Sequence, residues 1–264
     1  MHADIPGPRV VLVFAGHDPS GGAGIQADIE TITASGCRCV SLITALTAQS
    51  TRGFTALYPQ QPARFRKQAR LLTADIKVHA CKLGLIGSIA LADSISVILS
   101  ELPAGLPLVF DPVLAAGSGE AVAGRELMKA IRTRLLKSTT VLTPNAAEAR
   151  LLTRRKDIHQ AAEVLLKWGC GSVLVTGADE DMPLVRNTLF GRDFEPEYYE
   201  WDRLPGIYHG SGCTLSSSIA AQLALGEDIK SAVYKAQEYT WQTLKHGFQL
   251  GGGQKHPNRF YRQR

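Results

Sequence analysis

A serine between two glycines, followed directly by a cysteine, is the first group of residues here that could carry chemistry. Gly210, Ser211 and Gly212 precede Cys213, and leucine and isoleucine then recur every four positions up to Gly226. This pattern predicts a tight loop entering a helix N-terminus, where unpaired N–H groups and the helix dipole bind anions. The same field favours a thiolate, so we expect an anion site beside a cysteine of lowered pKa. A glycine turn beside a small, half-buried cysteine is the alternative.

A second glycine loop lies near the start of the sequence. Val10–Phe14 is short, apolar and rich in β-branched residues, as in a buried parallel strand. Four glycines follow within Gly16–Gly24, and a helix is predicted from Ile25 to Ser35. Ligands of open α/β sheets bind at this edge, where strands end and helices begin. An ordinary turn needs fewer glycines, so a ligand-binding loop is favoured over a plain strand-to-helix turn.

Polar residues gather where the predicted strands end. They are Asp18, Gln49, Asp111, Asn145, Glu148 and Thr176. Asn145 before Glu148 also fits a helix capping box, and Asp111 before proline also fits a turn. Six such residues at one edge, facing two glycine loops, nevertheless indicate a site.

Strands and helices alternate along the chain, which predicts an α/β fold with a mostly parallel sheet covered on both faces. The strands are expected at Arg9–Ala15, Val40–Leu46, Ile76–Leu83, Leu108–Phe110, Thr140–Leu142 and Ser172–Val175, with a hairpin from Leu189–Phe190 and Glu197–Trp201. Further helices are expected at Ala63–Ala74, Ala90–Ser100, Arg125–Leu136, Ala146–Leu152, Ile158–Trp168, after Cys213, and at Ile229–Lys245. With no repeat or linker, residues 1–264 are expected to form a single domain.

Composition narrows the classes of partner. The 264 residues carry a net charge of +5, and the basic residues are scattered without interleaved aromatics. Nucleic acid is therefore not an expected partner, whereas a small anionic ligand is. No apolar stretch is long enough for a membrane span, and Met1–Pro6 does not begin a signal peptide. A cytoplasmic location is expected.

The remaining motifs exclude several chemistries. Cys37 and Cys39 lack the second ligand pair of a zinc site, and with Cys81 and Cys170 they are predicted to be reduced core or loop residues. The sequence contains no P-loop, no dinucleotide-binding glycine fingerprint and no nucleophile elbow.

Several motifs together resemble one family over nearly the whole chain. The motifs are Ala15–Asp28, Ile43–Thr51, Lys82–Leu85, Asp111–Val113, Thr143–Glu148 and His209–Thr214. They are similar to hydroxymethylpyrimidine/phosphomethylpyrimidine kinases, a thiamine-biosynthesis branch of the ribokinase-like proteins. The resemblance implies a ribokinase-like three-layer α/β/α sandwich and ATP-dependent phosphorylation of hydroxymethylpyrimidine (HMP), then of HMP phosphate. It also implies Mg²⁺ as cofactor, leaves room for a monovalent cation, and implies a homodimer.

The resemblance also assigns residues. Gly210, Ser211 and Gly212 would form the anion hole for the transferred phosphoryl group, and Cys213 would take the proton of the hydroxymethyl group. The expected substrate-binding residues are Gly16, Ala23, Asp28, Gln49 and Leu85. The expected nucleotide-binding residues are Asp111, Asn145, Glu148 and Thr176, and Glu148 would also hold magnesium through water. These roles suit phosphoryl transfer, which depends on positioning and on electrostatic stabilisation.

The sequence departs from the family pattern at four positions. Thr176 stands where a lysine near the nucleotide phosphates is common, His17 where Ser or Thr is common, Leu85 where Met is frequent, and Tyr208 where Thr is usual. The alternatives left open are a pyridoxal/pyridoxine kinase or a dual-substrate kinase, since both rings carry a hydroxymethyl arm. An alternative of another class is a non-catalytic regulator that binds a nucleotide or a pyrimidine.

Overall fold

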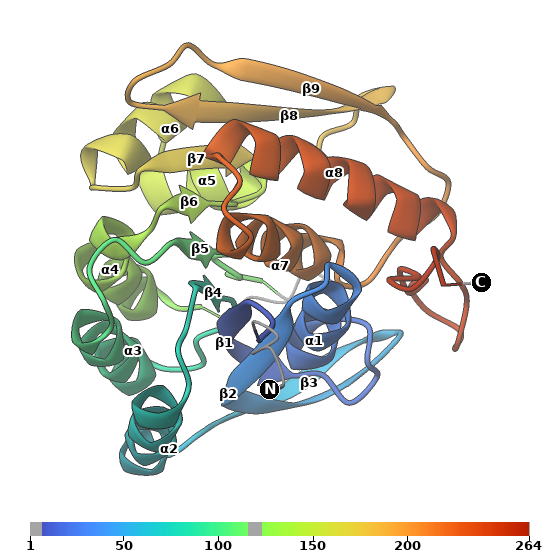
Figure 1. Cartoon of the computed structure of the whole chain (residues 1–264). Coiled ribbons are helices and arrows are strands. Elements are labelled where there is room, and N and C mark those ends of the chain that lie inside the picture. The colour runs from blue at the N-terminus through green and yellow to red at the C-terminus, as the bar shows by residue number, and fades with distance from the viewer. Residues whose placement is uncertain (1–6, 116–122, 264) are drawn as a thin grey trace, which may run out of the picture.

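A single sheet organises the computed structural model, which describes residues 7–115 and 123–263. In these ranges the sheet has nine strands in the order β3-β2-β1-β4-β5-β6-β7-β8-β9 (Figure 1). Met1–Pro6, the segment judged not to begin a signal peptide, lies outside the described residues. Within the described ranges, no helix combines the length and the apolar character that a bilayer span requires.

The strands are β1 (Val10–His17), β2 (Arg38–Ser50), β3 (Gly53–Pro59), β4 (Ala80–Leu83), β5 (Leu108–Phe110), β6 (Val141–Leu142), β7 (Ser172–Val175), β8 (Leu184–Gly191) and β9 (Glu197–Asp202). Neighbouring strands from β2 to β7 are parallel, whereas β3 at one edge and β8 and β9 at the other pair antiparallel. Strand β1 is buried on both faces, which explains its unbroken apolar sequence.

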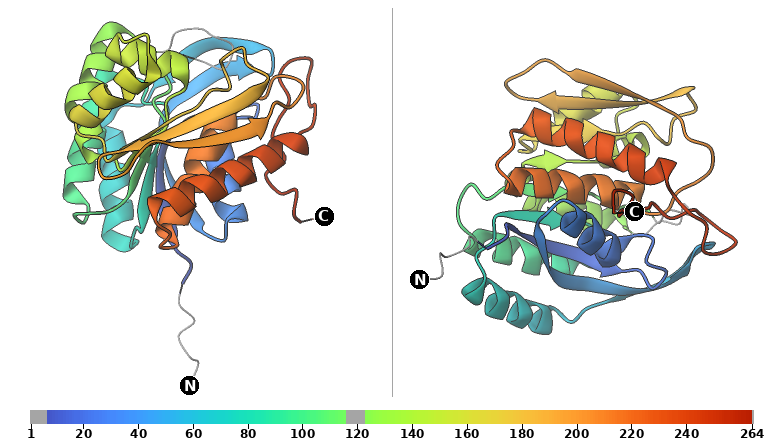
Figure 2. Two further views of the ribbon diagram at one scale, coloured as in Figure 1. Left: turned by 90° about the horizontal axis from the view of Figure 1, so that it is seen from above. Right: turned by 45° about the vertical axis from the view of Figure 1, so that its right-hand side comes forward.

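Helices cover the two faces of the sheet (Figure 2). One layer holds α1 (Gly24–Ala34), α7 (Ser211–Ala224) and α8 (Ile229–Lys245); the other holds α2 (Pro62–Asp75), α3 (Ile89–Glu101), α4 (Arg125–Arg134), α5 (Ala146–Thr153) and α6 (Ile158–Lys167). Alternate residues of β1 serve the two layers: Val11 and Val13 pack with α7, and Leu12 and Phe14 pack with α2 and α3. The predicted three-layer fold is confirmed.

Three sheet regions differ most from the sequence prediction, and one of them is β4, which begins at Ala80 and not at the expected Ile76. Strand β3 was not predicted, and β2 runs on to Ser50, so that Gln49 lies on a strand. The reason is that β3 is an edge strand without a fully buried residue, so its sequence lacks a continuous apolar run. The β8–β9 hairpin was predicted, but β8 begins at Leu184, five residues before the expected start at Leu189.

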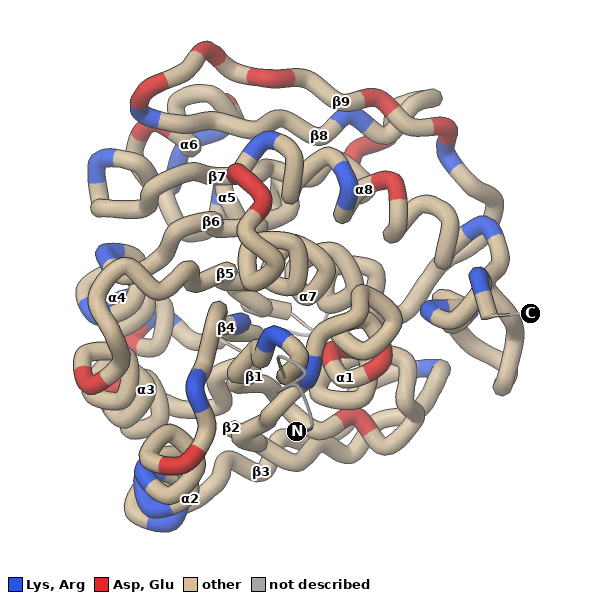
Figure 3. The backbone as a smooth tube through the Cα atoms, viewed as in Figure 1, with Lys and Arg blue, Asp and Glu red and all other residues tan. Residues whose placement is uncertain are grey.

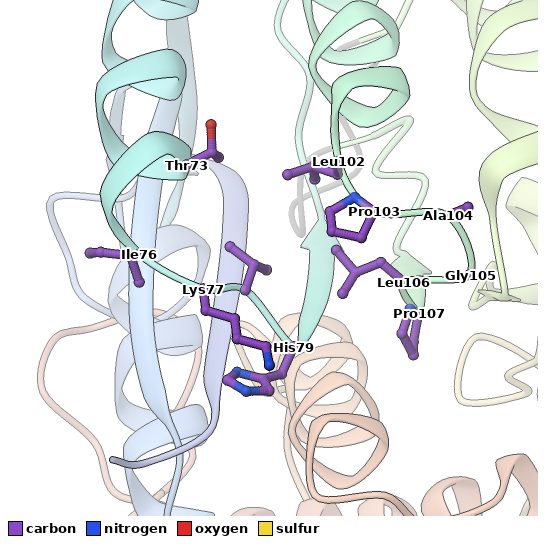
Figure 4. A pocket seen from close by; sticks show the side chains of 11 residues that line it. Thr73, Ile76, Lys77, His79, Leu102, Pro103, Ala104, Gly105, Leu106 and Pro107 are labelled. Carbon is purple, nitrogen blue, oxygen red and sulfur yellow. The ribbon is translucent and has the colours of Figure 1, made fainter. Parts of the chain in front are cut away.

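Charged residues of both signs are spread over the fold, whereas the cavities lie at opposite ends of the strands. Lys and Arg are interspersed with Asp and Glu over the backbone, without a single basic stripe in this view (Figure 3). A cavity of 380 Å³ lies between the end of α2 and the loop before β5, where Thr73, Ile76, Lys77 and His79 line one side and Leu102–Pro107 the other (Figure 4). It opens at the edge where β4 and β5 begin, whereas the other two cavities open where the strands end.

Candidate active site

The loop before α7 brings the two glycine segments together. Gly210 has φ +80°, a left-handed conformation that suits glycine, and α7 begins at the next residue, Ser211. A Cβ on Gly210 would overlap the backbone of Gly22, so only glycine permits this approach. The first helical bond of α7 runs from the Thr214 N–H to the Gly210 carbonyl. The preceding N–H groups of this turn therefore have no partner within the helix and can face an anion.

A small cavity of 80 Å³ lies between the first glycine loop and Cys213. Of the residues predicted from sequence, Gly16, Ala23, Gln49, Leu85 and Cys213 line it. The lining also includes Ala15, His17, Asp18, Gly24, Thr47, Phe54, Lys82, Val113 and His209. We call it the acceptor cavity, because it combines apolar walls with a few convergent polar groups.

Gln49 reaches this cavity from the end of β2. Its Nε2 donates to Thr47 Oγ1 at 2.9 Å, and the Thr47 hydroxyl in turn donates to the His17 carbonyl at 2.8 Å. The amide is thus held in place at the cavity wall, where its remaining donor and acceptor capacity can meet a heteroaromatic ring edge.

Asp18 holds the first glycine loop in shape. Its carboxylate accepts hydrogen bonds from Ser20 N at 2.9 Å, Ala23 N at 2.8 Å and His209 Nε2 at 2.9 Å. Burial raises the pKa of Asp18, but the hydrogen bonds from His209, Ala23 and Ser20 outweigh burial and lower it to about 2. Asp18 therefore stays ionised and ties the loop to the residue that precedes Gly210.

A buried ion pair lies beneath Cys213. Lys82 Nζ donates to Asp28 Oδ1 at 2.9 Å, and both side chains are 0% exposed. Ser217 Oγ of α7 donates to the same oxygen at 2.6 Å. Burial lowers the pKa of Lys82, but Asp28, Cys213 and Asp111 raise it further, so the ammonium is retained. Asp28 itself, predicted to contact the substrate, is not among the residues that line the acceptor cavity; it pairs with Lys82, which is.

The prediction of a lowered pKa for Cys213 is wrong for this structure. The residue is half-buried, but its thiol is desolvated, and burial raises the pKa to about 12. The Lys82 ammonium lowers the pKa, whereas the carboxylates of Asp111 and Asp28 raise it again. Desolvation thus outweighs the favourable charge, because water no longer stabilises the thiolate.

A wider groove of 540 Å³ opens on the other side of the α7 N-terminus. Ser211, Gly212 and Thr176 line it, as do Trp201, Tyr208 and Trp241. Asp111 lies below Gly212, and its Oδ2 accepts from Ser216 Oγ at 3.4 Å. We call it the nucleotide groove. The segment Gly210, Ser211 and Gly212, which we call the anion loop, thus separates a small acceptor cavity from a groove large enough for a nucleotide.

Asn145 and Glu148 form the capping box that was the structural alternative for this motif. Asn145 Oδ1 accepts from the Glu148 N–H at 2.8 Å, and Glu148 Oε2 accepts from the Asn145 N–H at 3.0 Å. Glu148 Oε1 also accepts from Leu114 N at 3.2 Å. Burial, and then the nearby Asp111 charge, raise the pKa of Glu148 to about 8 despite these bonds. For Asp111, burial likewise raises the pKa, to about 6, against the lowering effect of Lys82.

Sequence reasoning gave no role to three residues of this site, namely Lys82, His209 and Arg259. Lys82 could have been noticed, since a charged residue inside a fully buried strand requires a partner. His209 is 191 residues from its partner Asp18. Arg259 is 45 residues from its partner Thr214 and 237 from its partner Gly22 in the first glycine loop. Local sequence patterns cannot predict contacts between residues so far apart in the sequence.

The fold and the site are those of the ribokinase-like α/β kinases, and the comparison with known proteins agrees with this class. A family model described as phosphomethylpyrimidine kinase matches residues 18–258. A hydroxymethylpyrimidine/phosphomethylpyrimidine kinase of Streptomyces coelicolor is 36% identical over 93% of this chain and 92% of its own length. The chain therefore belongs to the phosphomethylpyrimidine kinase family.

Among the solved structures that share the fold, two illustrate the two kinds of acceptor. A phosphomethylpyrimidine kinase from Clostridium difficile 630 superposes with a TM-score of 0.78 at 32% identity, covering 89% of this chain and 99% of the other. A pyridoxal kinase of Bacillus subtilis in an ADP complex superposes with a TM-score of 0.87 at 27% identity, covering 97% and 99%. The fold thus hosts kinases named for either ring, and the acceptor must be argued from the site.

Proposed function

We propose that this chain transfers the terminal phosphoryl group of ATP to the hydroxymethyl group of HMP and then to HMP phosphate, in thiamine diphosphate biosynthesis. The observation that carries the proposal is the position of the α7 N-terminus between two cavities. Cys213 lines the acceptor cavity, while Ser211 and Gly212 line the nucleotide groove. A group passing from one cavity to the other would cross the free N–H groups of this turn.

The acceptor cavity supports a flat aminopyrimidine. Leu85, Phe54 and Val113 provide apolar walls, and the Gln49 amide lies at the edge. The ring nitrogen and the amino group need one donor and one acceptor, which a single amide supplies. Gly16 permits the Leu85 side chain to approach the backbone closely, because a Cβ at position 16 would lie 2.7 Å from a methyl carbon of Leu85. We propose that Asp28 acts through Lys82 and not by touching the ring.

The first transfer requires a base. In our proposal the Cys213 thiolate takes the proton of the hydroxymethyl oxygen while that oxygen bonds to phosphorus and the bond to the ADP oxygen breaks. With a pKa of about 12, Cys213 is largely a thiol near neutral pH. The Lys82 ammonium is the fixed charge that stabilises the small thiolate fraction. Late proton removal suits a loose transition state, which places little demand on the nucleophile.

The second transfer makes no such demand. The acceptor of HMP phosphate is a phosphate oxygen, which already carries negative charge near neutral pH. Its attack on ATP releases no proton that a base must take. The anion loop of Gly210, Ser211 and Gly212 would stabilise the transferred group in both steps.

The nucleotide groove supports ATP with Mg²⁺. Asp111, Asn145 and Glu148 are not among the residues that line the groove, but Asp111 lies against Gly212 and its charge raises the pKa of Glu148. Burial raises the pKa values of both carboxylates, so a divalent cation between them and the groove would relieve their unfavourable charge. When bound, Mg²⁺ would neutralise charge on the phosphates, and we propose that Glu148 contacts it through water, as Mg²⁺ commonly keeps several waters. Asn145 positions Glu148 through the capping box. Thr176 leaves this side without the usual lysine, and we propose that a monovalent cation supplies the charge.

We also propose that the chain functions as one kinase domain and as a cytoplasmic homodimer. The support for a second copy is the outer edge of β3, where Tyr58 is 57% exposed. Sheet edges of this kind can pair with another chain. Sedimentation at micromolar concentration tests the dimer, and a monomer across the concentration series would exclude it.

A product-resolved assay tests the proposed function. The chain is incubated with ATP, Mg²⁺ and HMP, HMP phosphate or pyridoxal, and the products are separated. The proposal predicts HMP phosphate and then HMP diphosphate, with slower turnover of pyridoxal. Preference for pyridoxal would establish the pyridoxal kinase alternative, which the likeness to the B. subtilis enzyme supports. ATP consumption that does not depend on any alcohol, or no consumption at all, would favour the non-catalytic regulator.

A further inference from the structure

The segment after α8, residues 247–262, contacts three segments beside the acceptor cavity, namely the β2–β3 turn, His209 and the first glycine loop; we call it the clasp. Gln254 N donates to the Thr51 carbonyl at 2.8 Å, in the turn that follows Gln49. The Lys255 carbonyl accepts from His209 N at 2.8 Å, just before the anion loop. In Figure 2, right, the clasp lies beside the β2–β3 turn, in agreement with these contacts.

The Arg259 side chain anchors the clasp in the protein interior. The residue is 3% exposed, and its guanidinium reaches three elements. Nε donates to Thr214 Oγ1 of α7 at 3.0 Å, Nη1 donates to Glu30 Oε2 of α1 at 2.9 Å, and Nη2 donates to the Gly22 carbonyl of the first glycine loop at 2.5 Å. A planar guanidinium fixes several directions at once, which a lysine ammonium on a flexible stem does not.

The partners of Arg259 are neighbours of the reacting groups. Thr214 follows Cys213 and donates its own hydroxyl to the Gly210 carbonyl at 2.9 Å, so the chain of bonds runs from Arg259 through Thr214 to the anion loop. Gly22 precedes Ala23, which lines the acceptor cavity. The arginine is itself anchored, because Tyr239 Oη donates to its carbonyl at 2.7 Å.

We propose that Arg259 is a positioning residue for the phosphoryl transfer: it fixes the first glycine loop against the first turn of α7, so that the acceptor alcohol meets Cys213 and the anion loop in line. The proposal rests on the proposed function. It assigns to Arg259 a part in the acceptor half of the reaction, since its guanidinium contacts Gly22 and Thr214 and none of the side chains that line the nucleotide groove, whereas Gln254 of the clasp does line that groove.

Steady-state kinetics of the full chain test this. Arg259→Ala should raise the acceptor KM and lower kcat, each by about tenfold, because a misplacement of about 1 Å near the chemistry is costly. The KM for ATP should stay within about twofold. Guanidinium ion at millimolar concentration should restore part of the activity of Arg259→Ala, and Arg259→Lys should remain impaired. Arg262→Ala is the matched control, because Arg262 is exposed and its guanidinium bonds to and stacks on its neighbour Tyr261.

Amide hydrogen exchange keeps the proposal testable if the wild-type chain phosphorylates neither HMP nor pyridoxal, an outcome that would refute the proposed function alone. Arg259→Ala should then accelerate exchange at Gly21–Gly24 and at Thr214, while amides of α3 exchange as in the wild type. Equal rises in both KM values, no guanidinium rescue, or uniform acceleration of exchange across the fold would show a general structural role and overturn the proposal. The variant Thr214→Val provides a second test, since it removes the acceptor of the Arg259 Nε bond and keeps the side-chain shape.

Discussion

The acceptor cavity and the nucleotide groove meet at the first turn of α7, yet they are stabilised in different ways. On the acceptor side, two buried ion pairs form within the chain, with Asp18 held by His209 and Lys82 by Asp28, although Asp28 Oδ2 and His256 Nε2 are buried without a hydrogen-bond partner. On the nucleotide side, burial raises the pKa values of Asp111 and Glu148, and the Asp111 charge raises that of Glu148 further. The chain itself thus organises much of the acceptor side, and we propose that a bound cation and nucleotide complete the nucleotide side.

The two sides should respond to pH in opposite directions. The pKa of Asp18 falls from 3.8 to about 2 on folding, so its contribution to stability is present above pH 3.8 and is lost as pH falls through 2. The pKa of Glu148 rises from 4.5 to about 8, so the stability linked to its proton is present below pH 4.5 and is lost as pH rises through 8. A cation in the nucleotide groove should offset the second loss.

The largest effect is expected from breaking the ion pair under the acceptor cavity. Lys82→Met leaves the Asp28 carboxylate buried without its cation and should cost about 3–5 kcal/mol of unfolding free energy in urea titration. The double variant Lys82→Met/Asp28→Asn should recover most of that loss. Lys77→Met is the control, because Lys77 is exposed. An unchanged urea midpoint for Lys82→Met would contradict the buried pair.

Removing the thiol should act on chemistry and not on binding. Cys213→Ser should lower kcat for HMP by about 10²-fold or more, because a serine hydroxyl is a far weaker base. The KM for HMP should change little. In the wild type, the rate of the chemical step should rise about tenfold per pH unit through the neutral range, since the thiolate of a group with pKa about 12 increases in that proportion. A flat pH profile would exclude Cys213 as the base.

Ring recognition is the next effect in size. Gln49→Leu leaves the ring nitrogen and amino group unpaired, at about 1–3 kcal/mol, and should raise the KM for HMP by about 5- to 150-fold. The KM for ATP should hardly move, nor should either KM change in Gln160→Leu, an exposed position on α6. Equal effects of Gln49→Leu on both substrates would mean that this residue supports the fold.

The smallest change concerns the nucleotide side. Glu148→Gln keeps the shape of the capping box and removes the charge, so the Mg²⁺ concentration for half-maximal rate should rise about tenfold and kcat should fall. Without metal, the melting temperature of the variant should drop less between pH 5 and pH 8 than that of the wild type, because the neutral amide has no proton to lose. A role in capping alone predicts lower stability and an unshifted magnesium curve.

Local sequence patterns predicted the fold well, because each parallel strand and covering helix carries its own periodicity. Strands β5 and β7 and helix α8 begin and end where expected. Edge strand β3 was missed since its pairing, and not its composition, makes it a strand. The approach of the two glycine loops, the Lys82–Asp28 pair and the Arg259 contacts depend on residues far apart in sequence. The prediction of a lowered pKa for Cys213 was wrong for the same reason. The position of the cysteine on a helix can be read from the local sequence, but the burial that raises its pKa depends on tertiary packing.

One measurement tests the central claim most directly: the rates of the two phosphorylation steps in Cys213→Ser, each started from its own acceptor and compared with the wild type. Because HMP needs a base and HMP phosphate does not, the account predicts that the first rate falls about 10²-fold while the second falls far less. Equal losses in both steps, or none in the first, would contradict a base at Cys213 between the acceptor cavity and the nucleotide groove.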